Sequence, residues 1–404
     1  MKIGLISFHS FLKPGGVKTH ILGLHQEFKK RGIESKIIAP RRSRSENYGR
    51  DVVLLGTSFP VNFNGTQTDF CVNFNPLSLD KALKKEKFDI LHFHNFGIPS
   101  SLQFLERSPS LNILTFHANI ERSEFLKKFP VFFRIFKKIV KWKMDGIIGV
   151  APLNLKVFKD YSGPKTVIPN GINIQKFSLE AQRIGKFADG KTNILFVGRI
   201  EKRKGLIYLL KAYEILTKKF SNLRLIVVGE GNAKKDCQLW VKSHNLKEVY
   251  FEGEASDKEL HSYYGSSDIF VSPAIFGESF GIVLLEAMAS GLPVAAFANK
   301  GYKQFLKGKR MEEFLARPKD FESLAEKIEI LIKDEGLRKK MGEWGRFEAK
   351  NYSWGKVTDR ILDFYKLCQE SASWRKKQEK KNFSMDKILN KIYNKDILDW
   401  LKPK

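Results

Sequence analysis

Short apolar segments alternate with amphipathic helical segments along most of this chain, and the alternation restarts once near its middle. It is typical of βαβ units, which build parallel sheets covered by helices. The predicted strands are residues 3–7, 37–39, 52–55, 90–93, 113–116, 146–150 and 166–168, then 194–197, 224–228, 249–252, 269–272 and 293–297. We therefore expect an α/β protein with two Rossmann-like domains. Their ligand would bind at the carboxyl ends of the strands, in the cleft between the domains.

A polar stretch at residues 178–191 separates the two halves, and we interpret it as an interdomain linker. The first domain then covers residues 1–177 and the second covers residues 192–353. A helix over residues 354–370 and a basic tail over residues 371–404 complete the predicted organisation.

The chain is strongly basic, since its 404 residues include 71 Lys and Arg against 44 Asp and Glu, a net charge of +27. This charge favours an anionic partner: a nucleic acid, an anionic membrane or a phosphorylated substrate. Because 42% of the residues are hydrophobic, sizeable cores are expected and wholesale disorder is excluded. The three cysteines are far apart, which argues against a disulfide framework and fits a reducing cytoplasm.

The longest weakly polar run, residues 281–298, is about long enough to span a bilayer. It contains Glu286, however, and residues 291–293 interrupt it, so we interpret it as a helix followed by a buried strand. Neither a transmembrane helix nor a targeting segment is expected. The expected location is the cytoplasm, with peripheral contact to the inner face of the plasma membrane as an option.

The stretch at residues 277–294 carries the most chemical information. A predicted strand ends, a loop with two glycines follows, and a helix begins, so its backbone N–H groups can bind an anion. Glu278 precedes this helix and Glu286 follows eight residues later, up to about 12 Å away along a helix. One carboxylate can then reach a sugar and the other a ribose on the far side of a diphosphate. The alternative is a buried helix with a stray glutamate.

This stretch resembles the retaining GT-B glycosyltransferases of glycosyltransferase family 4, whose E-x7-E pattern it contains. Residues 198–205 are similar to the G-R-x4-K-G motif of that family, and residues 167–173 to its interdomain P-N-G motif. Residues 228–231 and 14–17 resemble its V-G-E-G and Gly-Gly loop motifs. Within the family, the phosphatidylinositol mannosyltransferases and similar lipid-glycan enzymes are the nearest resemblance.

The resemblance implies two Rossmann-like lobes, with a carboxy-terminal helix that returns to the first. It implies a retaining hexosyltransferase that needs neither a metal nor a cofactor. The donor would be a GDP- or UDP-sugar, with mannose as a candidate sugar. The acceptor would be a lipid-linked or cell-envelope glycan.

The residues themselves offer phosphate ligands at two loops. Arg199 and Lys204 follow the first strand of the second half, where a guanidinium fork and an ammonium charge suit phosphate oxygens. Two solvated cations are the alternative. Gly15 and Gly16 permit positive φ and close approach of the backbone to a ligand, or form an ordinary turn.

By resemblance, Glu278 holds sugar hydroxyls, Glu286 holds the ribose, and Arg199 and Lys204 neutralise the leaving diphosphate. The implied catalytic residues are His117, Arg199, Lys204 and Glu278. The implied donor-binding residues are Gly15, Gly16, Ser279, Phe280, Gly281, Ile282 and Glu286.

Three histidines lie near the carboxyl ends of predicted strands in the first half. By resemblance, His117 contacts the donor sugar near the reaction centre, although a lone histidine is more often structural. His92 and His94 alternate onto one face of a strand. A metal site would need a third ligand, which the sequence does not identify, so no metal is expected. His94 is a candidate for the acceptor side.

Two basic segments mix cations with apolar residues, at 125–143 and 384–401. Each can lie on an anionic membrane, or can pack its apolar face into the protein. Specific nucleic-acid binding is the competing interpretation of the charge, but no nucleic-acid-binding motif is present. A catalytically inactive sugar-nucleotide-binding relative is a third possibility, which the joint presence of Glu278, Glu286, Arg199 and Lys204 disfavours.

Overall fold

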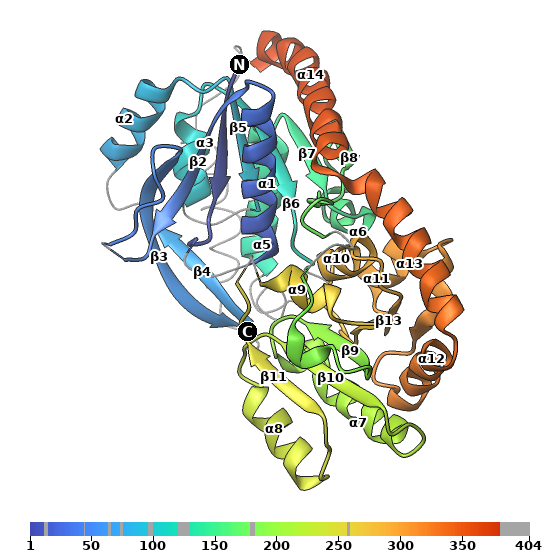
Figure 1. Ribbon diagram of the computed structural model, residues 1–404. Helices are drawn as coiled ribbons and strands as arrows, with labels where there is room; N and C mark the ends of the chain where they lie inside the picture. The colour runs from blue at the N-terminus through green and yellow to red at the C-terminus, as the bar shows by residue number, and fades with distance from the viewer. Residues whose placement is uncertain are drawn as a thin grey trace, which may run out of the picture. The chain divides into compact units, whose positions relative to one another are not determined.

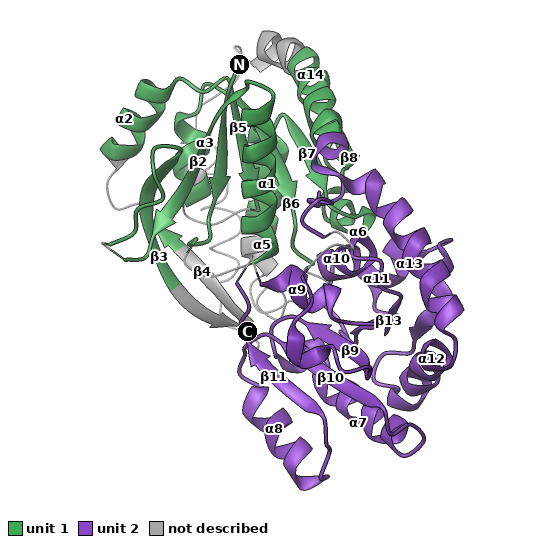
Figure 2. Ribbon diagram, viewed as in Figure 1, with its two compact units in different colours: residues 1–64, 68–168, 358–404 green, residues 65–67, 169–357 purple. Residues whose placement is uncertain are grey.

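The structure is a computed structural model that describes residues 1–11, 15–43, 45–63, 66–72, 76–95, 100–119, 130–177, 182–256 and 259–379. The chain divides into two compact units (Figure 2). Unit 1 contains residues 1–64, 68–168 and 358–404, and unit 2 contains residues 65–67 and 169–357. Figure 1 shows a sheet with helices in each unit. Across the described ranges, no helix is both long and apolar enough to cross a membrane.

Unit 1 is built on an eight-stranded sheet with the order β4-β3-β2-β1-β5-β6-β7-β8. Its pairs from β3 to β8 are parallel. The central strands are buried throughout, as expected for a parallel sheet covered on both faces. The strands are β1 (Lys2–Ser7), β2 (Glu34–Arg41), β3 (Val52–Phe63), β4 (Thr66–Val72), β5 (Ile90–His94), β6 (Leu111–Phe116), β7 (Gly146–Gly149) and β8 (Lys165–Val167).

The helices of unit 1 pack a phenylalanine-rich core against this sheet. Phe116 of β6 contacts Phe136 and Phe158, with ring centroids 6.3 and 5.1 Å away. Phe136 lies on α5, so this part of the basic 125–143 segment buries an aromatic residue in the protein. The helices are α1 (Gly16–Lys30), α2 (Pro76–Glu86), α3 (Ser100–Arg107), α5 (Pro130–Lys143) and α6 (Pro152–Leu155), with the 3-10 helix Lys156–Phe158.

The last helix, α14 (Trp354–Glu379), begins in unit 2 and continues into unit 1. There the hydroxyl of Tyr365 is hydrogen bonded to His92 of β5 at 2.6 Å. A side chain at Gly146 of β7 would overlap the buried Cys368. The glycine therefore allows close packing of α14 on the sheet, and the predicted return of the carboxy-terminal helix is confirmed.

Unit 2 contains a six-stranded parallel sheet with the order β11-β10-β9-β12-β13-β14. Numbered within the unit, this is the order 3-2-1-4-5-6 of Rossmann folds. Its strands are β9 (Thr192–Val197), β10 (Leu223–Val228), β11 (Val249–Gly253), β12 (Ile269–Ser272), β13 (Val294–Phe297) and β14 (Leu315–Ala316). Its helices are α7 (Leu206–Thr217), α8 (Lys234–Ser243), α9 (Leu260–Gly265), α10 (Ile282–Ala289), α11 (Lys300–Leu306), α12 (Phe321–Lys333) and α13 (Glu335–Ala349).

The predicted strands all occur, and within the described residues the strands that the sequence missed are β4 and β14, at the edges of the two sheets. The structure places the boundaries between the units after residues 168 and 357. The described part of the expected linker belongs to unit 2, where it buries Phe187. Helix α14 extends to Glu379, into the expected tail. The segment 384–401 and residues 125–129 lie outside the described residues.

Candidate functional site

The order of the strands in unit 2 creates a binding position beside its first strand. The neighbours of β9 are β10 and β12, and the chain leaves the carboxyl ends of β9 and β12 in different directions. Ligands of Rossmann folds bind in the crevice at this switch point. Arg199 and Lys204 follow β9, and Glu278 follows β12. The topology therefore brings these three predicted residues to one end of one sheet.

The two loops that carry these residues are joined by backbone contacts. The amide of Ile275 donates to the carbonyl of Arg203 at 2.8 Å. Gly205 has a positive φ of 72°, and a side chain there would overlap the carbonyl oxygen of Pro273. Gly205 is thus required for this turn, and the loops after β9 and β12 hold each other in place.

Glu278 is the centre of an ion-pair cluster. Its Oε1 lies 2.8 Å from Nζ of Lys204 and 2.9 Å from Nη1 of Arg203, and its side chain is 12% exposed. Burial opposes ionisation of Glu278, but the charges and hydrogen bonds of Lys204 and Arg203 outweigh it and hold its pKa below the usual value. Glu278 is therefore a carboxylate at neutral pH.

Arg203 and Glu201 belong to the same cluster, although the sequence analysis did not single them out. Glu201 forms an ion pair with Arg199 through Oε1 at 2.8 Å, and its Oε2 accepts a hydrogen bond from Nε of Arg203 at 2.9 Å. Arg203 is thus placed between two carboxylates, while the side chain of Arg199 stays half exposed. The cluster has three cations and two carboxylates, a net charge that favours an added anion.

The donor-binding loop leads into α10 through Gly281. Gly281 has φ 86°, and a side chain there would overlap the ring of Tyr302. In the described part of the chain, no side chain caps α10 at Gly281, so the start of the helix suits an anion. Phe280 is buried against Phe305, with ring centroids 4.6 Å apart, so its side chain has a packing role. Ser279 and Ile282 flank this turn.

Glu286 lies on α10 and is 9% exposed. Its Oε2 accepts a hydrogen bond from the hydroxyl of Tyr264 at 2.9 Å. Burial and the nearby carboxylate raise the pKa of Tyr264, which keeps the phenol protonated as a donor. Tyr264 is a third residue that the sequence analysis missed, because β12 separates its short helix from α10. It fixes the orientation of the Glu286 carboxylate.

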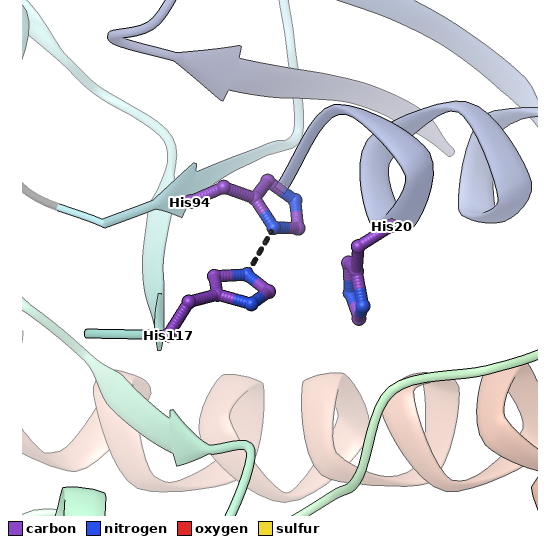
Figure 3. A group of neighbouring side chains, drawn as sticks. All are labelled: His20, His94 and His117. Atoms are coloured by element: carbon purple, nitrogen blue, oxygen red, sulfur yellow. Dashed lines mark hydrogen bonds between the residues drawn. The ribbon is translucent and has the colours of Figure 1, made fainter. Parts of the chain in front are cut away.

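The candidate residues of unit 1 gather at the carboxyl ends of β1, β5 and β6, which are neighbours in its sheet. His94 ends β5, His117 follows β6, and His20 lies on α1 (Figure 3). Nδ1 of His94 is 3.3 Å from Nε2 of His117, and the ring of His20 is centred 4.8 Å from that of His117. The structure therefore places His20, which the sequence analysis did not single out, beside His94 and His117.

His92 has a different environment from the other three histidines. Its ring nitrogens contact the hydroxyls of Tyr365 and Thr115, each at 2.6 Å. Its ring centroid is 4.3 Å from that of His94, which confirms that the two side chains share a face of β5. Burial, with smaller contributions from neighbouring histidines, lowers the pKa values of His92, His94 and His117 well below the ordinary value. These imidazoles are therefore neutral at pH 7.

The two glycines at the start of α1 have conformations that the sequence analysis did not anticipate. The φ of Gly15 is 173°, which is extended, so the expectation of positive φ is wrong there. No described atom lies within 4 Å of a side chain built at Gly15 or Gly16. The described residues therefore do not require glycine at either position, and the close approach of a ligand to these glycines stays a prediction.

Comparison with known proteins agrees with these motifs. Residues 14–176 match the family described as Glycosyltransferase Family 4, and residues 178–347 match the family described as Glycosyl transferases group 1. The phosphatidyl-myo-inositol mannosyltransferase of Mycobacterium leprae is 32% identical over 380 residues, covering 92% of this chain and 98% of that protein. The same enzyme of Mycolicibacterium smegmatis is 30% identical, covering 90% and 93%.

Solved structures share the fold at low sequence identity. Sucrose-phosphate synthase from Thermosynechococcus elongatus has a TM-score of 0.74 at 19% identity, covering 92% of this chain and 99% of its own. Anabaena HepE, solved with UDP and glucose, has a TM-score of 0.70 at 16% identity, covering 91% and 99%. Both are GT-B glycosyltransferases, so the predicted fold class is confirmed.

The fold and the motifs define a GT-B hexosyltransferase. The chain belongs to glycosyltransferase family 4, and relatives named phosphatidyl-myo-inositol mannosyltransferase match it over most of its length.

Proposed function

We propose that this chain transfers mannose from GDP-mannose to an inositol phospholipid, with retention of configuration and without a catalytic metal. The names of the relatives that match almost its whole length support both the sugar and the acceptor. A UDP-sugar is the competing donor, and another lipid-linked or cell-envelope glycan is the competing acceptor.

The observation that carries this proposal is the cluster of Lys204, Arg203 and Glu278 at the switch point of unit 2. A donor diphosphate would accept hydrogen bonds from Lys204 and from the half-exposed Arg199. Glu278 would then bind hydroxyls of the transferred sugar, because a carboxylate accepts hydrogen bonds from hydroxyl donors.

In the proposed reaction, the bond between the anomeric carbon and the leaving phosphate breaks while the acceptor oxygen adds to the same face. The leaving phosphate takes the proton of the acceptor hydroxyl, so no protein nucleophile is needed. Negative charge grows on the diphosphate in the transition state. Lys204, Arg199 and the amides at the start of α10 would stabilise that charge.

The remaining site residues would position the two ends of the donor. Glu286, held by Tyr264, would accept hydrogen bonds from the ribose hydroxyls. In unit 1, neutral His117 would contact a hydroxyl of the sugar, and the Gly15–Gly16 turn would allow close approach of the diphosphate. A neutral imidazole can both donate and accept a hydrogen bond, which suits a hydroxyl.

We further propose that the protein acts peripherally at the inner face of the plasma membrane. On α5, Arg134, Lys138 and Lys141 are exposed, whereas Phe136 and Val140 are buried in unit 1. The described contribution of α5 would therefore be electrostatic attraction to anionic headgroups. Replacing Lys138 and Lys141 with glutamate should reduce co-sedimentation with anionic vesicles. The contact would be refuted if the variant bound anionic vesicles as well as the wild type does. It would also be refuted if the wild type bound neutral and anionic vesicles equally.

The transfer reaction itself tests the proposed function. Purified full-length protein is incubated with labelled GDP-mannose or UDP-glucose, phosphatidylinositol vesicles and EDTA, and the lipid product is analysed by NMR. We expect mannosylated lipid with the α-configuration of the donor, and an equal rate with and without EDTA. An inverted product or loss of activity in EDTA would refute the mechanism, and transfer from UDP-glucose alone would refute the donor.

A further inference from the structure

Three histidines from three separate elements of unit 1 lie close together at one end of its sheet (Figure 3). His20 is on α1, His94 is the last residue of β5, and His117 follows β6. Because β1, β5 and β6 are adjacent and α1 follows β1, the sheet order determines this convergence. His20 and His94 lie on regular elements and His117 directly follows one, and regular elements hold a ligand set more accurately than loops do.

The distances between the imidazole nitrogens suit a transition-metal ion. One nitrogen from each ring lies within 4.8 Å of one from each of the others. Two nitrogens bound tetrahedrally to zinc at about 2.05 Å are roughly 3.3 Å apart. His94 Nδ1 and His117 Nε2 already have this spacing, at 3.3 Å. The longest separation between ligand nitrogens, at most 4.8 Å, would have to shorten by about 1.5 Å to reach the tetrahedral spacing. Rotation of the side chains can provide this change.

The chemistry of the donors selects the class of metal. All three are imidazoles, which bind Zn²⁺, Cu²⁺ and Ni²⁺ well, whereas Mg²⁺ and Ca²⁺ require oxygen ligands. The ring nitrogens of His94 and His117 that face each other are Nδ1 and Nε2, so these two atoms would bind the ion.

The surroundings of the cluster hold it in place. His92 packs beside His94 and is itself fixed by Tyr365 and Thr115. The side chain of Asn95 accepts a hydrogen bond from the backbone amide of His117 at 2.8 Å. Such outer contacts orient the residues that bind a metal and strengthen binding.

We propose that His20, His94 and His117 form an inhibitory site for Zn²⁺ or a chemically similar transition-metal ion. The inhibitory role rests on the function proposed above, in which His117 contacts the donor sugar. A ring nitrogen of His117 that binds a metal ion cannot also bind the sugar. The metal-binding role rests on the cluster alone. The site is consistent with a reaction that needs no metal, since the ion would compete with the substrate for His117.

Metal binding is tested first, without reference to activity. Full-length protein is freed of metal with EDTA, transferred to chelator-free buffer and titrated with Co²⁺, and Zn²⁺ is then added as a competitor. We expect one equivalent of Co²⁺ with the visible absorption of tetrahedral coordination, displaced by Zn²⁺. His20→Gln should weaken Zn²⁺ binding at least tenfold, whereas the exposed His244→Gln is the matched control and should not change it. Binding that is absent, or unchanged in His20→Gln, would overturn the site.

Zinc X-ray absorption of the wild-type protein covers the case in which a variant does not fold. Three imidazole ligands are expected, and one or none would overturn the proposal. Zn²⁺ should also inhibit transfer, with a higher inhibition constant in His20→Gln. Tight zinc binding without inhibition would refute the inhibitory role. If zinc binds as expected but no donor supports transfer, the metal site stands and the proposed function fails.

Discussion

Replacement of Glu278 by alanine would remove the carboxylate that both Lys204 and Arg203 contact, at 2.8 and 2.9 Å. Leaving a buried charge without its partner costs about 3–5 kcal/mol. Arg203 keeps Glu201 as a partner, and Lys204 is 13% exposed, so we expect about 3 kcal/mol of lost stability. A diphosphate would then no longer compete with Glu278 for Lys204. The variant should therefore bind GDP about tenfold more tightly, or about 1.4 kcal/mol, while losing transfer activity.

Urea denaturation at pH 7.5 measures the stability of the variant, and titration calorimetry measures its affinity for GDP. Glu278→Gln is the matched control, since it keeps the size and a hydrogen-bond acceptor and should lose less stability. The reasoning fails if Glu278→Ala is as stable as wild type, or if it binds GDP more weakly. Weaker binding would mean that the carboxylate holds the cations in place for the diphosphate.

Three further predictions concern buried contacts. The free energy of unfolding should decrease as the pH falls below about 6.5, because His92 binds a proton in the unfolded chain but not in its buried site. His92→Gln should reduce this pH dependence by up to about 1.4 kcal/mol per pH unit, as measured by denaturation in the presence of EDTA. Tyr264→Phe removes the hydrogen bond to Glu286 and should raise the KM for the donor several-fold with a smaller change in kcat; an unchanged KM would exclude this positioning role. Gly146→Ala would overlap Cys368 and should cost about 1–3 kcal/mol in thermal or urea unfolding; no loss would show that α14 can move away.

The sequence was sufficient for the fold because the alternation of strands and helices is strong in both halves. The predicted strand at 113–116 is buried along its whole length, and the predicted strand at 269–272 has the observed bounds. The edge strand β4 and the short β14 were missed, since the first four residues of β4 are polar and β14 has two residues. Helix α14 was predicted too short, because residues 371–379 are mostly polar in sequence and resemble a tail.

The site was only partly predictable, because several of its contacts depend on long-range packing. Among the adjacent cations after β9, Arg203 reaches Glu278 only because of the 3-10 turn that ends at Gly205. His20 joins His94 and His117 only through the order of β1, β5 and β6, which no local pattern determines. Glu278 and Glu286, by contrast, could be identified as candidates from the E-x7-E spacing in the sequence alone.

The central claim is that the cations after β9 hold the diphosphate of the donor. Equilibrium binding of GDP-mannose to the wild type, Lys204→Ala and Lys202→Ala tests it most directly, since Lys202 is an exposed neighbour in the same loop. We predict that Lys204→Ala binds at least about tenfold more weakly and that Lys202→Ala stays within about twofold of the wild type. Equal affinities for Lys204→Ala and the wild type would contradict the account.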